Sequence, residues 1–176
     1  MTASVLIFPG IGNSGPGHWQ SLWEQDHPDF ERVQQRDWDN PICDEWAVNL
    51  EVAVANAKPN VIIVAHSLAC LVVALWASKR HTPIKAALLV AVPNPIGSNF
   101  PKEASGFLST PEQRFDFRSI VVASTDDPYT TLEHSSHLVS AWGSELVNIG
   151  DHGHINANSG LGAWPEGYQL LTKLRG

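Results

Sequence analysis

The chain has 176 residues, of which 43% are hydrophobic and 16% charged, and its formal net charge is −7. This length predicts one domain, residues 1–176, and a charged fraction below the usual ~25% excludes a disordered chain. The 11 Lys and Arg residues do not cluster along the sequence. We therefore expect no nucleic-acid partner, because a phosphate backbone would meet no basic surface.

The sequence shows neither a disulfide framework nor a targeting segment. Cys43 and Cys70 lie in apolar, helix-like contexts, where a free cysteine behaves as a small hydrophobic residue. The apolar run at 5–8 is too short for a signal peptide, and no apolar stretch approaches the ~18 residues that span a membrane. We therefore expect a soluble, cytoplasmic protein that does not interact with membranes.

Short apolar runs alternate with amphipathic segments. In chain order, the pattern predicts a strand at 4–8, a helix at 16–27, a weaker strand at 32–36, a helix at 43–57, a strand at 61–65, a helix at 68–80, strands at 86–92 and 119–124, a helix at 131–142, a strand at 145–149 and a helix at 165–174. Strands that are apolar on both faces indicate a sheet covered by helices on both sides. The alternation predicts an α/β fold, a doubly wound parallel sheet of about six strands.

The third predicted strand runs into Ala-His-Ser-Leu-Ala at 65–69, and a helix follows at once. Active sites in such sheets lie at the carboxyl ends of the strands, and a strand–turn–helix context is typical of a nucleophile elbow. The elbow needs small residues two before and two after the serine; alanine stands at both places, where glycine is usual. The alternative is that Ser67 only caps the following helix, and these five residues alone favour neither interpretation.

The order of residues further along the chain favours the elbow. A serine nucleophile needs a base and a group that orients the base, and in this fold the chain order is serine, acid, histidine. Asp126 and Asp127 follow the fifth predicted strand, and His152 and His154 follow the sixth. The order predicts a triad of Ser67 with one residue from each pair.

One residue of each pair is favoured. Asp127 immediately precedes a proline, as is usual for the acid loop, whereas Asp126 is expected to make turn hydrogen bonds. A glycine before His154 lets the loop bend this imidazole back over the sheet, whereas His152 is expected in the loop or at the rim. The sequence therefore predicts Ser67, Asp127 and His154 as the catalytic residues, with Asp126 as the alternative acid.

Two backbone N–H groups are expected to form an oxyanion hole. One belongs to Leu68, the residue after the nucleophile, and the other to the loop after the first strand. In that loop Ile11 is favoured and Gly12 is the alternative, although the loop can also be an ordinary turn. It lacks the spacing of a phosphate-binding loop, so no nucleotide is predicted.

Three residues after early elements are candidates for the substrate pocket. They are His18, Trp19 and Trp38. For each tryptophan the sequence favours a place in the core over the pocket wall, and His18 can merely begin a helix. Residues 93–118 provide a loop but too little chain for a cap domain, so we expect an open site for a small-molecule ester or amide.

Through these motifs, the sequence resembles the α/β-hydrolase superfamily and, more narrowly, the small serine hydrolases of the YdeN and retinoblastoma-binding-protein-nine family. The resemblance rests on Phe-Pro-Gly at 8–10, Gly-Pro-Gly-His-Trp at 15–19, Val-Ala-His-Ser at 64–67, Ser-Thr-Asp-Asp-Pro at 124–128 and the segment from Gly-His at 153 to glycine 167. It implies a minimal α/β-hydrolase fold, a triad of Ser67, Asp127 and His154, and neither a metal nor an organic cofactor. The matched residues indicate no protein partner.

Two other classes of function remain open. A hydrolytic metal site would draw on Asp126, Asp127, His134, His137, His152 and His154. The sequence has no His-Glu-x-x-His spacing, however, and such a site would leave the serine unexplained. A protein-binding module on a hydrolase fold would keep the triad only as a vestige. If none of these histidines takes part in a site, His66 is expected to pack where the helix at 68–80 begins, and His134 and His137 to lie on a solvated face of the helix at 131–142.

Overall fold

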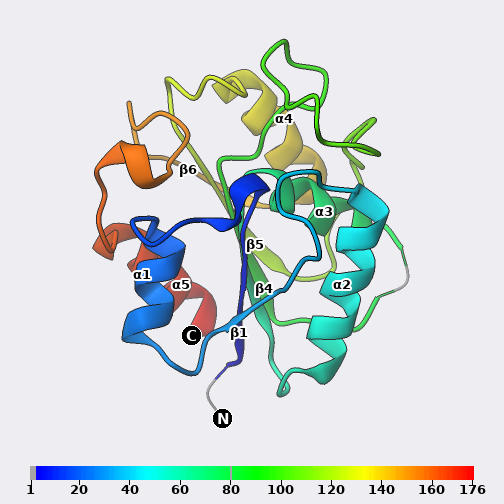
Figure 1. Cartoon of the computed structure of the whole chain (residues 1–176), viewed down its shortest axis with the longest axis vertical. Coiled ribbons are helices and arrows are strands. Elements are labelled where there is room, and N and C mark those ends of the chain that lie inside the picture. Colours follow the sequence, from blue (N-terminus) through cyan, green and yellow to red (C-terminus); the bar gives the residue numbers. More distant parts are fainter. Residues whose placement is uncertain (1–2, 80) are drawn as a thin grey trace.

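A six-stranded parallel sheet forms the centre of the protein (Figure 1). The computed structural model describes residues 3–79 and 81–176. The strands are β1 (Val5–Phe8), β2 (Glu31–Arg32), β3 (Ile62–His66), β4 (Ala86–Val90), β5 (Arg118–Ala123) and β6 (Glu145–Asn148), in the order β2-β1-β3-β4-β5-β6. All neighbouring strands are parallel, which confirms the predicted α/β fold.

Helices cover both faces of the sheet (Figure 1). On one face lie α1 (Trp19–Asp26) and α5 (Pro165–Arg175), and on the other lie α2 (Cys43–Asn56), α3 (Leu68–Ala77) and α4 (Leu132–Trp142). Two short 3₁₀ turns, η1 (Ile11–Asn13) and η2 (Ala157–Ser159), follow β1 and β6. The loops that carry the candidate residues therefore leave the sheet at the carboxyl ends of the strands.

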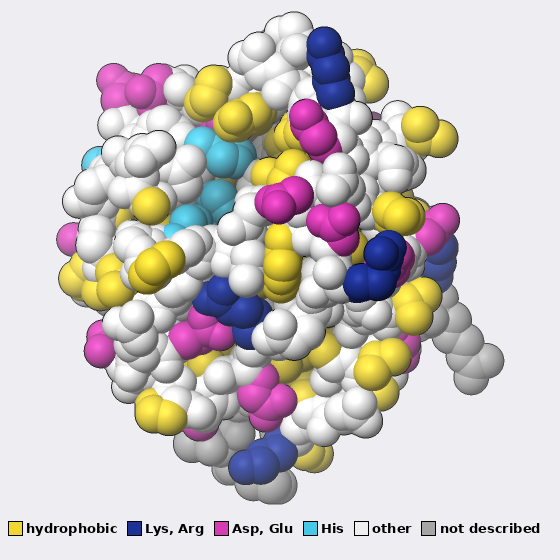
Figure 2. Space-filling view, in the orientation of Figure 1, with side chains coloured by type: hydrophobic (Ala, Val, Ile, Leu, Met, Phe, Trp, Pro, Cys, Tyr) yellow, Lys and Arg dark blue, Asp and Glu magenta, His cyan; other side chains and the backbone are white. Residues whose placement is uncertain are grey.

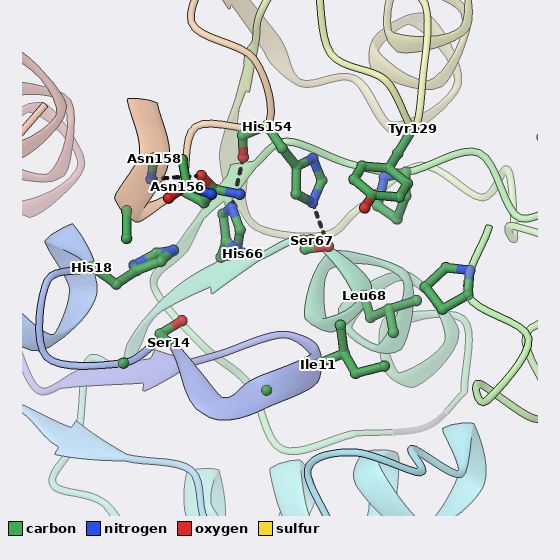
Figure 3. A pocket seen from close by; sticks show the side chains of 15 residues that line it. Ile11, Ser14, His18, His66, Ser67, Leu68, Tyr129, His154, Asn156 and Asn158 are labelled. Carbon is green, nitrogen blue, oxygen red and sulfur yellow. Dashed lines mark hydrogen bonds between the residues drawn. The ribbon is translucent and has the colours of Figure 1, made fainter. Parts of the chain in front are cut away.

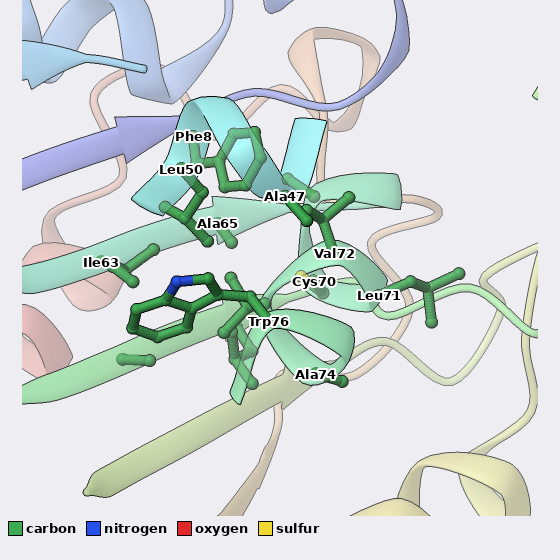
Figure 4. Close-up of a cluster of buried hydrophobic side chains, with 14 of the residues drawn as sticks. Phe8, Ala47, Leu50, Ile63, Ala65, Cys70, Leu71, Val72, Ala74 and Trp76 are labelled. Atoms are coloured by element: carbon green, nitrogen blue, oxygen red, sulfur yellow. The ribbon is translucent and has the colours of Figure 1, made fainter. Parts of the chain in front are cut away.

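Side chains of the central strands alternate between two apolar cores. In β1, Leu6 and Phe8 belong to the core beneath α2, α3 and α4, whereas Val5 and Ile7 belong to the core beneath α1 and α5. Figure 4 shows part of the first core, where Phe8 and Leu50 lie between the sheet and α2. Every residue of β1, β3 and β4 is buried, which explains why these strands appear in the sequence as continuous apolar runs.

Three elements differ from their predicted bounds by three residues or more. The strand predicted at 32–36 is reduced to β2, which lies at the sheet edge and pairs with β1 alone. Only Val33 continues the pairing, through one backbone bond of 2.9 Å to Ile7. The helix predicted from 16 begins at Trp19, because the backbone N–H of His18 closes a turn on Gly15. α3 ends at Ala77, and the predicted end at position 80 lies outside the described residues.

The segment that connects β4 to β5 contains no helix and no strand. One residue of this segment, Ser105, forms an isolated β-bridge with Ile42. It therefore adds a loop beside the carboxyl ends of the strands and no cap domain. Within the part of the chain that the structure describes, no helix combines the length and the apolar character that crossing a membrane would require.

Both cysteines are buried and free of disulfide bonds. Burial raises the pKa of the Cys43 thiol to about 12, and it raises the pKa of the Cys70 thiol as well. Both thiols are therefore protonated near neutral pH and pack as small apolar groups, as the sequence predicted.

The packing of α2 gives a matched pair of stability variants. Leu50 is 0% exposed and Val48, on the same helix, is 62% exposed. We expect Leu50→Ala to lower the free energy of unfolding by about 2–5 kcal/mol, because it leaves a cavity in the core. We expect Val48→Ala to change it by less than about 0.5 kcal/mol. Urea denaturation followed by circular dichroism measures both, and equal effects would contradict the described burial of this helix face.

Candidate active site

Ser67 is the single residue between β3 and α3, and its backbone is strained. Its φ is 57° and its ψ is −127°, a conformation that side-chain-bearing residues rarely adopt. Such a conformation costs on the order of 1–3 kcal/mol and persists only where the surroundings enforce it. Here the Ser67 N–H donates to the Val90 carbonyl at 2.9 Å, and the Ser67 carbonyl accepts from the Cys70 N–H at 2.9 Å.

Small residues allow the chain to fold so closely around this serine. Ala65 and Ala69 are both fully buried, so alanine is small enough where the sequence pattern would have glycine. A third small residue, Gly10, comes from the loop after β1. A Cβ atom added to Gly10 would lie 2.9 Å from the Ser67 Cβ and 3.0 Å from the His66 carbonyl oxygen. The loop after β1 therefore lies directly against the elbow.

A chain of hydrogen bonds connects Ser67 with His154 and Asp127. The Ser67 Oγ lies 2.7 Å from the His154 Nε2 (Figure 3), and the His154 Nδ1 lies 2.9 Å and 3.0 Å from the two Asp127 carboxylate oxygens. An ionised carboxylate only accepts hydrogen bonds, so the proton of a neutral ring is on Nδ1. The Nε2 then accepts the Ser67 O–H. The Asp127 side chain is fully buried and that of His154 is 10% exposed.

The two neighbouring aspartates have different partners. The Asp127 Oδ1 also accepts the Tyr129 N–H at 2.9 Å, which helps to fix the carboxylate. The Asp126 Oδ1 instead accepts the Gly153 N–H at 2.7 Å and the Ser124 hydroxyl at 2.9 Å. These hydrogen bonds hold the pKa of Asp126 below its usual value. Asp126 thus ties the aspartate loop to the histidine loop without touching the His154 ring.

His66 and His152 hold loops rather than acting on Ser67. The buried His66 ring lies 5.1 Å from the His154 ring, and its Nε2–H donates to the His154 carbonyl oxygen at 2.9 Å. Burial, together with the neighbouring His18 and His154, lowers the pKa of His66 well below the usual value, so the ring is neutral. The His152 N–H donates to the Ser124 Oγ at 2.9 Å. No motif in the sequence indicated this hydrogen bond between His66 and the His154 carbonyl oxygen.

Two backbone N–H groups beside Ser67 are free to bind an oxygen atom. Among the described residues, neither the Ile11 nor the Leu68 N–H has a hydrogen-bond partner, and both residues line the cavity beside Ser67. The alternative, Gly12, donates its N–H to the Trp38 carbonyl oxygen at 3.0 Å. Gly12 is therefore committed to a structural bond, and Ile11 remains available.

A cavity of about 280 Å³ opens above Ser67. Figure 3 shows Ser14, His18, His66, Asn156 and Asn158 on one side of Ser67, and Ile11, Leu68 and Tyr129 on the other. In Figure 2, histidine side chains are visible in a hollow of the surface. Lys and Arg side chains are scattered over the rest of this face. The cavity is therefore small, with a polar side and a more apolar side.

Of the three predicted pocket residues, only His18 borders this cavity. Trp19 is 1% exposed and packs against Trp23 and Trp164, with ring centroids 4.8 and 5.1 Å away. Trp38 packs on Trp46 at 5.5 Å. The prediction that these tryptophans line the pocket was therefore wrong, because both anchor their loops to the cores.

The residues of the alternative metal site do not come together. His137 is exposed on α4 and lies 3.0 Å from Glu112, while His134 is half-buried one helical turn away. Across residues 3–79 and 81–176, no group of three or more His, Cys, Asp or Glu side chains has an arrangement that could hold a metal ion.

The protein has the α/β-hydrolase fold. This fold combines a parallel sheet, a serine at the turn between a strand and a helix, here β3 and α3, and an acid and a histidine on later loops. A family model described as serine hydrolase matches residues 5–173, and the chain belongs to this family. No curated protein matches the sequence.

Solved structures agree with this assignment. A YdeN-like hydrolase of Pectobacterium atrosepticum is 27% identical, with a TM-score of 0.88 over 99% of this chain and 91% of that one. The ydeN gene product of B. subtilis is 20% identical, with a TM-score of 0.76 over 98% of each chain. Esterase 2 of Thermogutta terrifontis, phosphonylated by cyclosarin, is 13% identical and has a TM-score of 0.70 over 98% of this chain and 81% of that one. The structures from B. subtilis and T. terrifontis are too distant in sequence to show more than the fold. The family match and these structures confirm the predicted resemblance to YdeN-like serine hydrolases.

The contact between Gly10 and the elbow can be tested with two glycine variants of one loop. We expect Gly10→Ala to lower the free energy of unfolding by about 1–3 kcal/mol, because the new methyl group overlaps Ser67 and His66. Gly17→Ala is the control, since a Cβ there meets nothing within 4 Å, and its effect should stay below about 0.5 kcal/mol. Thermal and urea denaturation measure both, and a Gly10→Ala protein as stable as the wild type would refute the close approach.

Proposed function

We propose that the protein hydrolyses small carboxylic esters or amides, with Ser67 as nucleophile, His154 as general base and Asp127 as the acid that orients it. The observation that carries this proposal is the continuous hydrogen-bonded chain from the Ser67 Oγ through the His154 ring to Asp127, with distances of 2.7 and 2.9 Å. The strained backbone of Ser67, at the mouth of a cavity, supports the same assignment, because strain of this kind concentrates at functional sites.

The first half of the reaction acylates the serine. As the Ser67 Oγ attacks the carbonyl carbon of the substrate, the His154 Nε2 takes the hydroxyl proton. The negative oxygen of the tetrahedral intermediate accepts hydrogen bonds from the Ile11 and Leu68 N–H groups, which have no other partner. Asp127 stabilises the imidazolium. The bond to the leaving oxygen or nitrogen then breaks, and His154 donates its proton to the leaving group.

The second half releases the acid. His154 takes a proton from a water molecule, whose oxygen attacks the acyl carbon. The second tetrahedral intermediate collapses, the bond to the Ser67 Oγ breaks, and His154 returns the proton to the serine. The proton balance closes without a cofactor, because the same imidazole acts as base and acid in turn.

The size of the cavity supports a small substrate. A volume of about 280 Å³ lies at the lower end of the ~300–1,000 Å³ that small-molecule sites usually have. The segment between β4 and β5 adds no helix that could close over it.

Esterase 2 of Thermogutta terrifontis, which reacts with the organophosphonate cyclosarin, shares this fold, and we propose that an organophosphonate also labels this protein.

Covalent labelling tests the nucleophile. We expect a fluorophosphonate probe to label wild-type protein at Ser67, and Ser67→Ala to abolish labelling and to lower the hydrolysis of p-nitrophenyl butyrate by several orders of magnitude. Ser136→Ala, a change at an exposed serine on α4, is the control and should keep both properties. Mass spectrometry locates the adduct. A well-folded Ser67→Ala protein that is still labelled, or activity that a strong chelator removes, would overturn the proposal.

The two aspartates provide a matched test of the acid. We expect Asp127→Asn to lower kcat about 10⁴-fold, because an amide that donates to Nδ1 favours the wrong histidine tautomer. Asp126→Asn should lower kcat by less than about tenfold, since the new amide oxygen still accepts the Gly153 N–H, more weakly than a carboxylate. Steady-state kinetics of both variants decide the assignment, which fails if Asp126→Asn is the more damaging change.

A further inference from the structure

His18, at the polar side of the cavity, has a tautomer fixed by the fold. It is the N-cap of α1, and its Nδ1 accepts the Gln20 N–H at 3.2 Å. An acceptor nitrogen carries no proton, so the proton of the neutral ring is on Nε2. Burial lowers the pKa of His18 to about 4, with further contributions from Arg32 and His154. Near neutral pH the ring therefore presents one uncharged N–H donor.

This donor has no partner in the protein. His18 is 4% exposed, and its Nε2 is buried without a hydrogen bond among the described residues. Five other buried side-chain atoms share this condition, in Gln35, Thr110, Thr130, His134 and Arg175, and none of those residues lines the cavity. A buried polar group without a partner is costly and calls for an explanation. For His18 the cavity itself offers one, because the ring forms part of its wall.

The ring is held so that its N–H cannot turn to another acceptor. It packs against the Trp19 and His66 rings, with centroids 5.2 and 4.7 Å away. The neighbouring Gln20 is fully buried; its amide donates to the Val64 carbonyl oxygen at 3.0 Å and its oxygen accepts the Ser14 hydroxyl at 2.7 Å. A donor fixed in this way is preorganised, so a ligand that meets it loses little ordering entropy.

Three other polar groups on this side of the cavity are already engaged. The Ser14 hydroxyl donates to Gln20, the His66 Nε2–H donates to the His154 carbonyl, and the Asn156 Oδ1 accepts the Asn158 N–H at 2.9 Å. No Lys or Arg lines the cavity, so an anionic group would find no counter-ion there. A hydrocarbon chain would leave the His18 N–H unpaired, and a cation cannot accept a hydrogen bond.

We propose that His18 determines specificity: the substrate hydrolysed at Ser67 carries an uncharged oxygen acceptor, such as an ether, hydroxyl or second carbonyl, that binds the His18 Nε2–H beside the scissile bond. The proposal rests on the hydrolytic function proposed above and narrows its substrates to oxygenated small esters or amides. Sites built to bond a polar group discriminate strongly against analogues that lack it, because the protein group is then left without a partner.

Two pairs of nearly isosteric esters test this. The acyl-side pair is p-nitrophenyl methoxyacetate and p-nitrophenyl butyrate, and the alcohol-side pair is 2-methoxyethyl butyrate and n-butyl butyrate. The variant is His18→Asn, because asparagine still caps α1 but its short amide withdraws the donor from the cavity. His137→Asn, at the exposed histidine of α4, is the matched control. The ratio of kcat/KM for the ether to that for the hydrocarbon ester is measured for each protein, and comparing this ratio between the variant and the wild type cancels the intrinsic reactivity of the esters.

We expect His18→Asn to lower this ratio about tenfold or more in one of the two pairs, and His137→Asn to leave both ratios unchanged. The pair that responds identifies the side of the scissile bond on which His18 acts. Ratios that are unchanged in both pairs for an active His18→Asn protein would overturn the proposal. Fluorophosphonate labelling of the same protein at Ser67 separates this result from a failure of the proposed function.

A second measurement does not depend on turnover. In Ser67→Ala protein with ¹⁵N-labelled histidine, NMR should show His18 protonated at Nε2. Its signal should shift on addition of tetrahydrofuran or diethyl ether, and much less with cyclopentane or n-pentane, which have no acceptor. A His18 protonated at Nδ1, or an equal response to the ethers and the hydrocarbons, would also refute the proposal.

Discussion

The arrangement of the site depends on one steric constraint, the close approach of two loops at Ser67. The serine has an unfavourable backbone conformation, which its backbone hydrogen bonds to Val90 and Cys70 hold. Ala65, Ala69 and Gly10 are small enough to allow the close approach. The same approach brings the loop after β1 against the start of α3. As a result Ile11 and Leu68, whose N–H groups have no partner among the described residues, both border the cavity beside the serine before any substrate is present. Such preorganisation is what makes donors effective in stabilising a developing charge.

The loops that follow β5 and β6 are held together by polar contacts, in addition to the burial of Ile155 in the apolar core beneath α1 and α5. Asp126 accepts the Gly153 N–H, and the Ser124 Oγ accepts the His152 N–H, so the aspartate loop holds the histidine loop at two points. From the opposite side, His66 donates to the carbonyl oxygen of His154. His154 is thus held through its ring by Asp127 and through its backbone by the residue that precedes Ser67. A hydrogen-bonded frame of this kind fixes a side chain without filling the space above it, which leaves the cavity open.

The sequence predicted the order of strands and helices, because β3 and β4 are buried on both faces and therefore consist of uninterrupted apolar residues. It also identified the residues that meet at the elbow, since a nucleophile turn constrains residue size and chain order. It could not show the partners of individual N–H groups: that Gly12 donates to Trp38, or that His66 donates to His154, depends on loops far apart in the chain. The roles of Trp19 and Trp38 were mistaken for a related reason, because an aromatic side chain after a strand packs equally well in a core and in a pocket wall.

The three histidines beside Ser67 touch one another in a row, with ring centroids 4.7 Å apart between His18 and His66 and 5.1 Å apart between His66 and His154. Three protonated imidazoles at such spacing would repel one another strongly. Burial instead keeps His18 and His66 uncharged. In the proposed reaction, the imidazolium that forms at His154 therefore lies between the Asp127 carboxylate and an uncharged neighbour, His66. The two uncharged histidines, His18 and His66, thus leave His154 as the one ring of this row that the proposed reaction charges.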